Sequence, residues 1–374
     1  MPLRPDGLPC PRRRMNTRDG RPGVVVLVQP GARSSTWAIA DRLAPAGNYA
    51  ARLQRAGQAA GIASPSGLIF GGEPTGAAEE RIHRNANMTD PVHVPPPVFN
   101  FNAYSPAEIQ EAVETVGVKK TNMPFLPSFT LAVVAGGAIG LGALYYTIVV
   151  SDPSLGFAAA RVLGGVVFSL GLVIVLIGGA ELFTSNNLIV MAWASGKVST
   201  KDVMRNWIIV YCGNLVGSIG LVVLVFLSHH LDMQGGRVGL SVLNTAAGKI
   251  APDLGTLFFK GILCNMLVCM GVWIAYAGHS VSDKILGLIL PISAFVAAGF
   301  EHCVANMYFL PLAWVLAEAG KTPADFDASL ITIGGIVHNL VPVTLGNIVG
   351  GAGFVGVVYW LIYKKGLGSG PSKP

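Results

Sequence analysis

Hydrophobic residues run along most of the chain after residue 120 in long, nearly uninterrupted segments. A helix rises about 1.5 Å per residue, so about 20 apolar residues cross a hydrocarbon layer of about 30 Å. The segments that reach this length are residues 127–150, 162–198, 206–228, 254–278, 285–318 and 330–362. The pattern predicts an all-α integral membrane protein with six transmembrane helices.

The second and fifth segments exceed the length of one crossing, and each contains a polar cluster in its middle. The clusters are ELFTSNN at residues 181–187 and EHCVAN at residues 301–306. Such an interruption is typical of transporters, in which a half-helix, a non-helical break and a second half-helix follow one another. We predict that transmembrane helices 2 and 5 are broken at these clusters.

The two halves of this region repeat one another in order. The first cluster is followed by Ala192-Trp193 and GNLVG at residues 213–217, and the second by Ala313-Trp314 and GNIVG at residues 346–350. Three spans per half is an odd number, so the second half must enter the membrane from the opposite side. The sequence predicts a 3+3 inverted repeat. We interpret the glycines of the two GN-x-VG blocks as helix-packing sites, because glycines four apart let helices approach closely.

A short helix is predicted over about residues 105–118, before the first span. Ser105 supplies a capping hydroxyl, Pro106 suits the first helical position, and Glu108 can bind back to the cap. This helix has one apolar stripe and several acidic residues. We expect it to lie along the membrane surface.

Basic residues in the short loops predict the orientation of the spans, since Lys and Arg accumulate on the cytoplasmic side. Eight of them fall on the side shared by the two termini, and four fall on the opposite side. We therefore predict that both termini are cytoplasmic.

The charges divide the chain near Met88. Residues 1–87 contain twelve Arg, no Lys and six acidic residues, whereas residues 88–374 contain three Arg, eleven Lys and fourteen acidic residues. Because the first part is also rich in Pro, Gly and Ala, we predict a disordered tail over residues 1–97. A transport domain over residues 98–365 and a short cytoplasmic tail over residues 366–374 follow.

Two interpretations of the N-terminal tail stay open. It is a basic arm attracted to anionic lipid or nucleic acid, or it is upstream sequence included by an over-extended start, with Met88 as the true beginning. We favour the second interpretation because Arg and Lys usage changes so abruptly. We accordingly expect no nucleic-acid partner.

Two broken helices at one depth predict a substrate site. A break is tolerated in hydrocarbon only inside protein or beside a wet cavity, and the amino ends of half-helices favour an anion. His302 can exchange a proton with a weak-acid substrate near neutral pH, or it is a neutral histidine bonded to the facing break. The hydroxyls of Thr184 and Ser185 can bind a passing anion or hold His302 in one tautomer.

Other residues near the two clusters have simpler expected roles. Leu182 and Phe183 would plug the path and exclude bulk ions, while Asn265 and Asn306 would satisfy carbonyl groups of the breaks. Lys249, before the fourth span, can raise the local concentration of anions or be an ordinary interfacial lysine. We expect Glu181 and Glu301 to be structural anchors and the cysteines to be small packing residues.

The region of residues 98–365 resembles the formate/nitrite transporter family. The motifs that carry the resemblance are ELFTS at 181–185, GNLVG at 213–217, Cys264-Asn265 with Val268-Cys269, FEH at 300–302 with ANM at 305–307, and PVT at 342–344 with GNIVGG at 346–351. The resemblance implies an aquaporin-like homopentamer with one pore per subunit, in the bacterial inner membrane. Its substrate would be formate, nitrite or a related small anion.

The same resemblance implies where the pore residues lie. Thr184 and His302 would mark its centre, Lys249 would be the vestibule lysine, and Asn265 would brace the break. The expected outer apolar constriction consists of Leu182, Phe183 and Val268, and the expected cytoplasmic constriction of Phe168, Leu172 and Phe295. His338 departs from the family pattern and adds a titratable group near the sixth span.

Three alternatives accompany the prediction of proton-linked passage of formate or nitrite. The substrate can instead be hydrosulfide, acetate or lactate. A channel for water or glycerol shares the architecture, although neither break contains an Asn-Pro-Ala signature. A membrane enzyme would need a nucleophile or metal constellation, and none occurs at suitable spacing, so we expect no enzymatic activity, no metal and no cofactor.

Overall fold

The structure is a computed structural model that describes residues 103–366, in which all regular elements are helices. The predicted disordered tail and the last residues lie outside this range. The first described helix is α3 (Pro106–Thr121), which begins after Ser105. Ser105 Oγ accepts from Glu108 N, and the Glu108 carboxylate accepts from Ser105 N at 2.7 Å. The predicted capping box is confirmed.

Six helical segments of the described range are long and apolar enough to cross a membrane. They are α4 (Phe125–Val150), α5 (Phe157–Gly178), α7 (Thr200–Leu227), α9 (Leu254–Ala277), α10 (Val281–Ala298) and the continuous segment Ile333–Tyr363. The last comprises α12 (Ile333–Ile348), the π-helical η3 (Val349–Val357) and α13 (Val358–Tyr363). The number and order of the predicted spans are confirmed.

Two of the apolar segments predicted from the sequence are interrupted, one after α5 and one after α10. After α5, Gly179 adopts φ +72°, and helical structure resumes with η1 (Ser185–Ile189) and α6 (Val190–Ala194). After α10, Gly299 adopts φ +73°, and α11 (Cys303–Glu318) follows. A left-handed residue ends a helix abruptly, and glycine takes this conformation without steric cost. We refer to residues 179–184 as break 1 and residues 299–302 as break 2.

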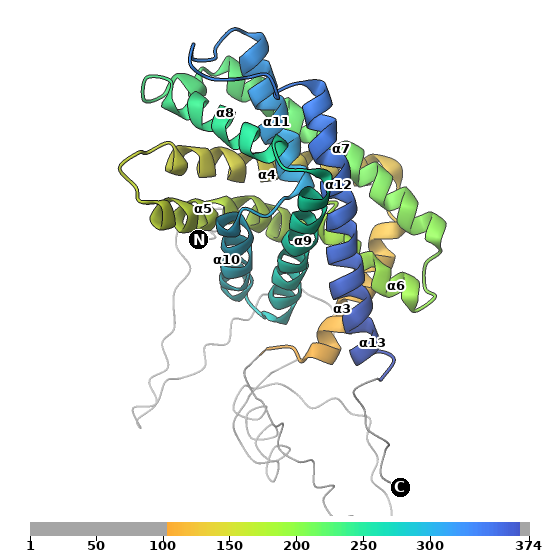
Figure 1. The fold of residues 1–374 in the computed structure, drawn as a ribbon. Coiled ribbons are helices and arrows are strands. Elements are labelled where there is room, and N and C mark those ends of the chain that lie inside the picture. The colour runs from red at the N-terminus through yellow and green to blue at the C-terminus, as the bar shows by residue number, and fades with distance from the viewer. Residues whose placement is uncertain (1–102, 367–374) are drawn as a thin grey trace, which may run out of the picture. The chain divides into compact units, whose positions relative to one another are not determined.

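Two further helices, η2 (His230–Asp232) and α8 (Arg237–Ile250), connect α7 and α9. Val238, Val242, Ala246 and Ile250 recur at intervals of four residues and are buried. This periodicity is visible in the sequence, although no helix was predicted there. Figure 1 shows α8 at one end of the helical bundle and α3 and α13 at the opposite end.

Glycines bring the helices of each half into close contact. A Cβ atom at Gly217 of α7 would overlap the carbonyl oxygen of Val133 in α4, and one at Gly350 of η3 would overlap that of Ile262 in α9. The interpretation of the GN-x-VG glycines as packing sites is therefore confirmed.

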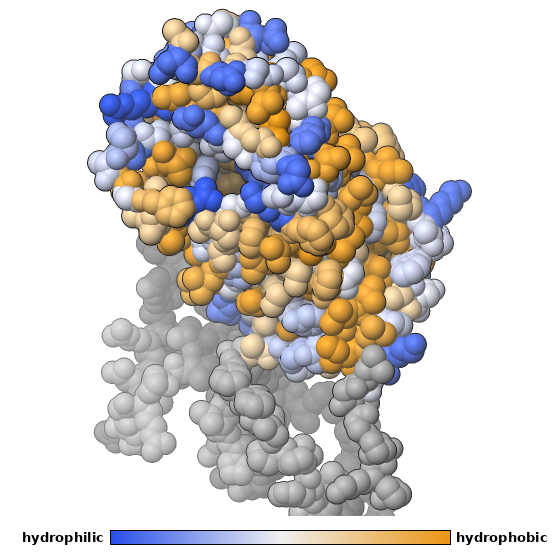
Figure 2. All heavy atoms as spheres, viewed as in Figure 1, coloured by the Kyte–Doolittle hydropathy of each residue, from blue (hydrophilic) through white to orange (hydrophobic). Residues whose placement is uncertain are grey.

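Hydropathy differs along the surface in a way that fits a membrane. Figure 2 shows hydrophobic residues spread over α9, α12 and α13, and hydrophilic residues gathered over α8 and the neighbouring loops. Large apolar side chains such as Leu286 and Leu290 of α10 are exposed by 67% and 75%. A bilayer is the solvent in which such surfaces are stable.

Candidate functional site

Two cavities reach into the described bundle from opposite ends. The larger, about 660 Å³, is lined by the first half of α5, α8, the start of α9 and break 2. The smaller, about 250 Å³, is lined by α3, the last turn of α5, η1 and the end of α9. Because α5 and α9 present opposite ends to the two cavities, the cavities lie on opposite sides of the breaks. We call them the Lys249 cavity and the Lys120 cavity after a lysine that lines each.

One hydrogen bond joins the two breaks between these cavities. Thr184 Oγ1 and His302 Nε2 lie 2.9 Å apart, and both side chains are buried. His302 lines the Lys249 cavity, and Ser185 lines the Lys120 cavity. The Thr184–His302 pair therefore stands at the boundary between the two cavities.

The hydrogen bond at the second ring nitrogen of His302 determines which of the two nitrogens carries the hydrogen. Nδ1 accepts a hydrogen bond from Ala305 N at 3.1 Å and so caps the amino end of α11. An accepting nitrogen carries no proton, so the neutral ring bears its hydrogen on Nε2 and donates it to Thr184 Oγ1. An imidazolium would lose this acceptor and meet the positive end of the α11 dipole. The geometry favours a neutral imidazole and leaves the Thr184 hydroxyl proton free to be donated elsewhere.

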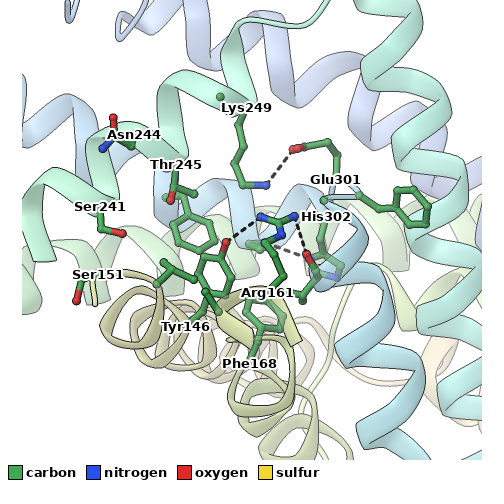
Figure 3. A pocket seen from close by; sticks show the side chains of 18 of the residues that line it. Tyr146, Ser151, Arg161, Phe168, Ser241, Asn244, Thr245, Lys249, Glu301 and His302 are labelled. Atoms are coloured by element: carbon green, nitrogen blue, oxygen red, sulfur yellow. Dashed lines mark hydrogen bonds and ion pairs between the residues drawn. The ribbon is translucent and has the colours of Figure 1, made fainter. Parts of the chain in front are cut away.

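A polar cluster lies beside break 2 at the Lys249 cavity. Lys249 Nζ lies 3.1 Å from Glu301 Oε2, which also accepts from Asn306 Nδ2 at 2.7 Å. Asn339 Nδ2 donates to Lys249 O at 2.7 Å, and Asn339 Oδ1 accepts from Asn306 at 2.7 Å. Asn306 thus binds the Glu301 carboxylate and Asn339, and not the loop carbonyls that we expected for it. The cluster binds α8, break 2, α11 and α12 together, and Figure 3 shows Lys249 reaching from α8 to Glu301.

The same arrangement occurs beside break 1 at the Lys120 cavity. Lys120 Nζ lies 2.9 Å from Glu181 Oε1, and Asn186 Nδ2 donates to Glu181 Oε2 at 2.7 Å and to Asn206 Oδ1 at 3.0 Å. Asn206 in turn donates to Lys120 O at 3.3 Å. From the sequence we counted Lys120 only among the eight basic residues on the side of the two termini, and we missed this role. The signal was the position of Lys120 at the end of a surface helix, like that of Lys249.

Two asparagines bind the backbone of the breaks. Asn214 Oδ1 accepts from Phe183 N at 2.9 Å, and its amide donates to Glu181 O at 2.9 Å and Ala132 O at 2.8 Å. Asn347 makes the matching set of bonds with Cys303 N, Glu301 O and Gly261 O. These are the asparagines of the two GN-x-VG blocks, for which we had considered only packing.

Asn265 of α9 binds the breaks from a third direction. Its amide nitrogen lies 3.2 Å from Thr184 O, 2.7 Å from Asn347 O and 2.8 Å from Asn187 Oδ1. Thr184 O also accepts from Cys269 Sγ at 3.4 Å. The backbone that carries the Thr184 hydroxyl is therefore held in place on the side of α9.

Two residues of the expected cytoplasmic constriction lie on the side of the breaks opposite to the one we expected. Phe168 and Phe295 line the Lys249 cavity, with ring centroids 5.8 Å apart and planes at 85°. The prediction placed Phe168, Leu172 and Phe295 on the side away from Lys249. The physical reason is the direction of α5, which starts at the Lys249 cavity, so its first half faces that side. Leu172, one turn further along α5, is buried.

The residues predicted for the other layer line neither cavity. Leu182 is fully buried, and Val268 lies in the half of α9 that leads to Val272 at the Lys120 cavity. Phe183 packs against α7, with its ring centroid 5.0 Å from that of Tyr211 and 6.2 Å from that of Trp207. The Phe183 ring thus fills space between break 1 and α7.

His338, the titratable group noted near the sixth span, binds a backbone carbonyl. His338 Nε2 lies 2.9 Å from Pro252 O, so this ring ties α12 to the loop before α9. Within the described residues, no group of three or more His, Cys, Asp or Glu side chains is placed to hold a metal ion.

Six membrane-capable helices, with a buried threonine–histidine contact between cavities that approach from opposite ends, define a multi-pass membrane protein of the channel or transporter class. Comparison with known proteins identifies the kind. A family profile described as Formate/nitrite transporter matches residues 107–361. The chain belongs to the formate/nitrite transporter family, whose members are channels and transporters.

Individual relatives support this assignment. The formate channel FocA of Escherichia coli (strain K12) is 39% identical over 275 residues, which cover 71% of this chain and 96% of that protein. FocA of Haemophilus influenzae is 41% identical over 266 residues, 68% of this chain and 93% of that protein. A solved structure described as a pentameric formate channel with formate bound has a TM-score of 0.59 and 43% identity, covering 64% of this chain and 97% of that one.

Proposed function

We propose that this chain passes formate, nitrite or a closely related small monovalent anion across the membrane, together with a proton. The path runs from the Lys249 cavity past the Thr184–His302 pair to the Lys120 cavity. The relatives support the substrate class, since the similar proteins include formate channels. A homopentamer with one path per subunit is part of the proposal, by similarity to the pentameric formate channel.

The observation that carries the proposal is the hydrogen bond between Thr184 and His302. It lies where the two cavities approach each other, and the ring of His302 stacks on Phe295 with centroids 5.8 Å apart. A hydroxyl whose proton is free can donate to one oxygen of a planar anion at this point. Apolar side chains on either side make passage of a bare charge costly.

The proton removes that cost. An anion that accepts a proton becomes a neutral acid, which crosses the apolar layers without a desolvated charge. The neutral His302 ring does not compete for this proton, because its Nδ1 is occupied by Ala305 N–H. Flux should then follow the concentration of the protonated acid.

The finer architecture of the proposal is a 3+3 inverted repeat. The two lysine–glutamate–asparagine clusters and the matching bonds of Asn214 and Asn347 support it. In such a repeat Glu301 corresponds to Glu181. The residue after each glutamate then also corresponds, so His302 occupies the position that Leu182 holds in the first half. The two halves would therefore differ most at the centre of the path, where only one supplies an imidazole.

The pH dependence of uptake tests the proposal. Purified protein in liposomes is expected to take up formate faster as the external pH falls, by roughly tenfold per pH unit while the neutral acid is limiting. His302→Asn should fold, since asparagine is a good helix N-cap. It should reduce the flux at every pH, because the Thr184 hydroxyl loses the imidazole N–H that leaves its own proton free for the anion. Uptake is measured with and without a pH gradient.

Two results would contradict the proposal. Electrogenic formate uptake that is indifferent to pH and to His302→Asn would show that the bare anion passes. Rapid swelling of the same liposomes with glycerol, with no formate uptake, would favour a neutral-solute channel.

A further inference from the structure

The Lys249 cavity carries an excess of positive charge. Its described lining includes the cations Arg161, Arg237, Lys249 and Lys260, whereas the one carboxylate in that lining is Glu301. A cavity with low-dielectric walls concentrates ions of the opposite sign. Whether a cation can bind an anion near the breaks depends on its depth and on the partners that it already has.

Lys249 is already paired. Its ammonium lies 3.1 Å from Glu301 and 5.6 Å from the ring centroid of Phe309. Glu301 cancels the charge of Lys249, and the pair belongs to the cluster that holds break 2. The main role of Lys249 in this geometry is structural.

Arg161 is held by neutral groups. Its guanidinium donates to Ala297 O at 2.9 Å, to Val296 O at 3.1 Å and to the Tyr146 hydroxyl at 3.2 Å. These carbonyls lie at the carboxyl end of α10, so Arg161 caps that helix. Figure 3 shows Arg161 beside Tyr146. Arg237 is exposed at the first residue of α8, at the opposite end of that helix from Lys249.

Lys260 differs from the other three cations. It lies six residues into α9, about 9 Å along the helix axis from Leu254, and it lines the Lys249 cavity. Its backbone carbonyl accepts from Glu301 N at 3.3 Å, so it is directly beside the residue that precedes His302. Its ammonium has no ion pair or hydrogen bond to another side chain in the described part of the chain. A charge at such depth is costly unless it faces water or a ligand.

We propose that Lys260 is the residue that binds the anion in the Lys249 cavity, immediately before the anion reaches Thr184 and His302. Its three ammonium protons are free, and a small planar anion with two oxygens can accept from them. Lys249 supports this site by holding break 2. The proposal rests on the function proposed above and adds the residue that captures the anion.

The first half has no equivalent of this charge. Glu181 N donates to Leu131 O at 3.3 Å, in the same way that Glu301 N donates to Lys260 O. At the matching position α4 therefore has a leucine, Leu131, which does not line the Lys120 cavity. Anion capture should be stronger from the Lys249 cavity than from the Lys120 cavity.

Initial rates of formate uptake against formate concentration test the assignment, in liposomes at one fixed pH and low ionic strength. Lys260→Gln should raise the half-saturating concentration about three- to tenfold, because a charge-assisted hydrogen bond is lost. Lys260→Arg retains the charge and should stay near the wild type. The effect of Lys260→Gln should shrink as salt is added, since salt screens the charge.

Lys284→Gln is the matched control, because Lys284 lies in the first turn of α10 and lines neither cavity. It should leave the half-saturating concentration unchanged. A wild-type value in Lys260→Gln, with wild-type flux intact, would overturn the assignment of Lys260 alone. A wild type that passes no formate would overturn both proposals.

Discussion

At the scale of single residues, the site depends on side chains that replace missing backbone hydrogen bonds. A broken helix leaves amide and carbonyl groups without partners, and in the membrane these groups have no water to bind. Asn214 and Asn347 each bind one amide and one carbonyl at a break and one carbonyl of a neighbouring helix, because a carboxamide offers both an acceptor and two donors. Few other side chains can do this in so small a volume.

Asn214→Ala is therefore expected to destabilise the protein. It leaves Phe183 N and Glu181 O unpaired, at about 1–3 kcal/mol for each buried group that stays unsatisfied, whereas Ala132 O lies inside α4 and keeps its helical hydrogen bond. Thermal unfolding in detergent measures the loss. Asn244→Ala is the control, since Asn244 is exposed on α8. Equal unfolding temperatures for the two variants would contradict this role of Asn214.

The sequence revealed which residues carry functional groups, but it revealed less about the partners of these residues in the fold. Thr184 and His302 could be predicted because polar and titratable groups are rare in apolar spans. The partners of Asn306 and the direction of the Phe183 ring could not, because they depend on which helix packs behind each break. Lys249 shows the same limit, since its sequence position did not reveal its bond to Glu301.

At the scale of helices, contact between α4 and α7 depends on glycine where the backbones touch. Gly217→Ala should destabilise the protein by about 1–3 kcal/mol, because the added methyl group overlaps Val133 O. Gly220→Ala lies on the same helix, where a Cβ atom meets nothing within 4 Å. It should have little effect. Unfolding in detergent compares the two variants, and a similar loss in both would contradict the contact.

The docking of α3 is expected to depend on pH through Glu114. Burial raises the pKa of Glu114, but bonds from Lys197 and Gln110, at 2.5 and 2.7 Å, together with the charge of Lys364, outweigh burial and leave the pKa below its usual value. A carboxylate with a lowered folded-state pKa stabilises the fold at neutral pH, and this contribution disappears as the pH falls through that pKa.

Thermal unfolding at several pH values tests this expectation. The wild type should be more stable than Glu114→Gln at neutral pH, and the difference should vanish in acid, once the pH lies below the lowered pKa of Glu114. Glu111→Gln, at an exposed position of the same helix, should show no such difference. A constant gap between wild type and Glu114→Gln at all pH values would contradict the ionic role.

Helix boundaries followed local chemistry closely in some places. The capping box at Ser105 predicted the start of α3, whereas the third span was expected at residue 206 and α7 begins at Thr200. Ser199 and Asp202 form a second capping box there, which extends the helix through a polar first turn outside the apolar segment. Hydropathy alone detects only the part of a helix that is apolar.

At the scale of the whole molecule, the two breaks are each held by a lysine–glutamate pair on opposite sides of the Thr184–His302 contact. The excess length and the central polar clusters of the second and fifth apolar segments made two breaks predictable. The predicted side of Phe168 and Phe295 was wrong, because placing these residues requires following the direction of each span across the membrane. A motif names the residues of a path, but the topology decides which end of the path they face.

The position of Asn347 has a consequence for biosynthesis. It completes break 2 by bonding to Glu301, yet it is made 46 residues later, in the last membrane span. Chains are synthesised from the amino end, so break 2 lacks its backbone partners until almost every helix has been inserted. An unfinished subunit therefore lacks the bonds from Asn347 to Glu301 O and Cys303 N, so break 2 reaches its final geometry only after the last span has been inserted.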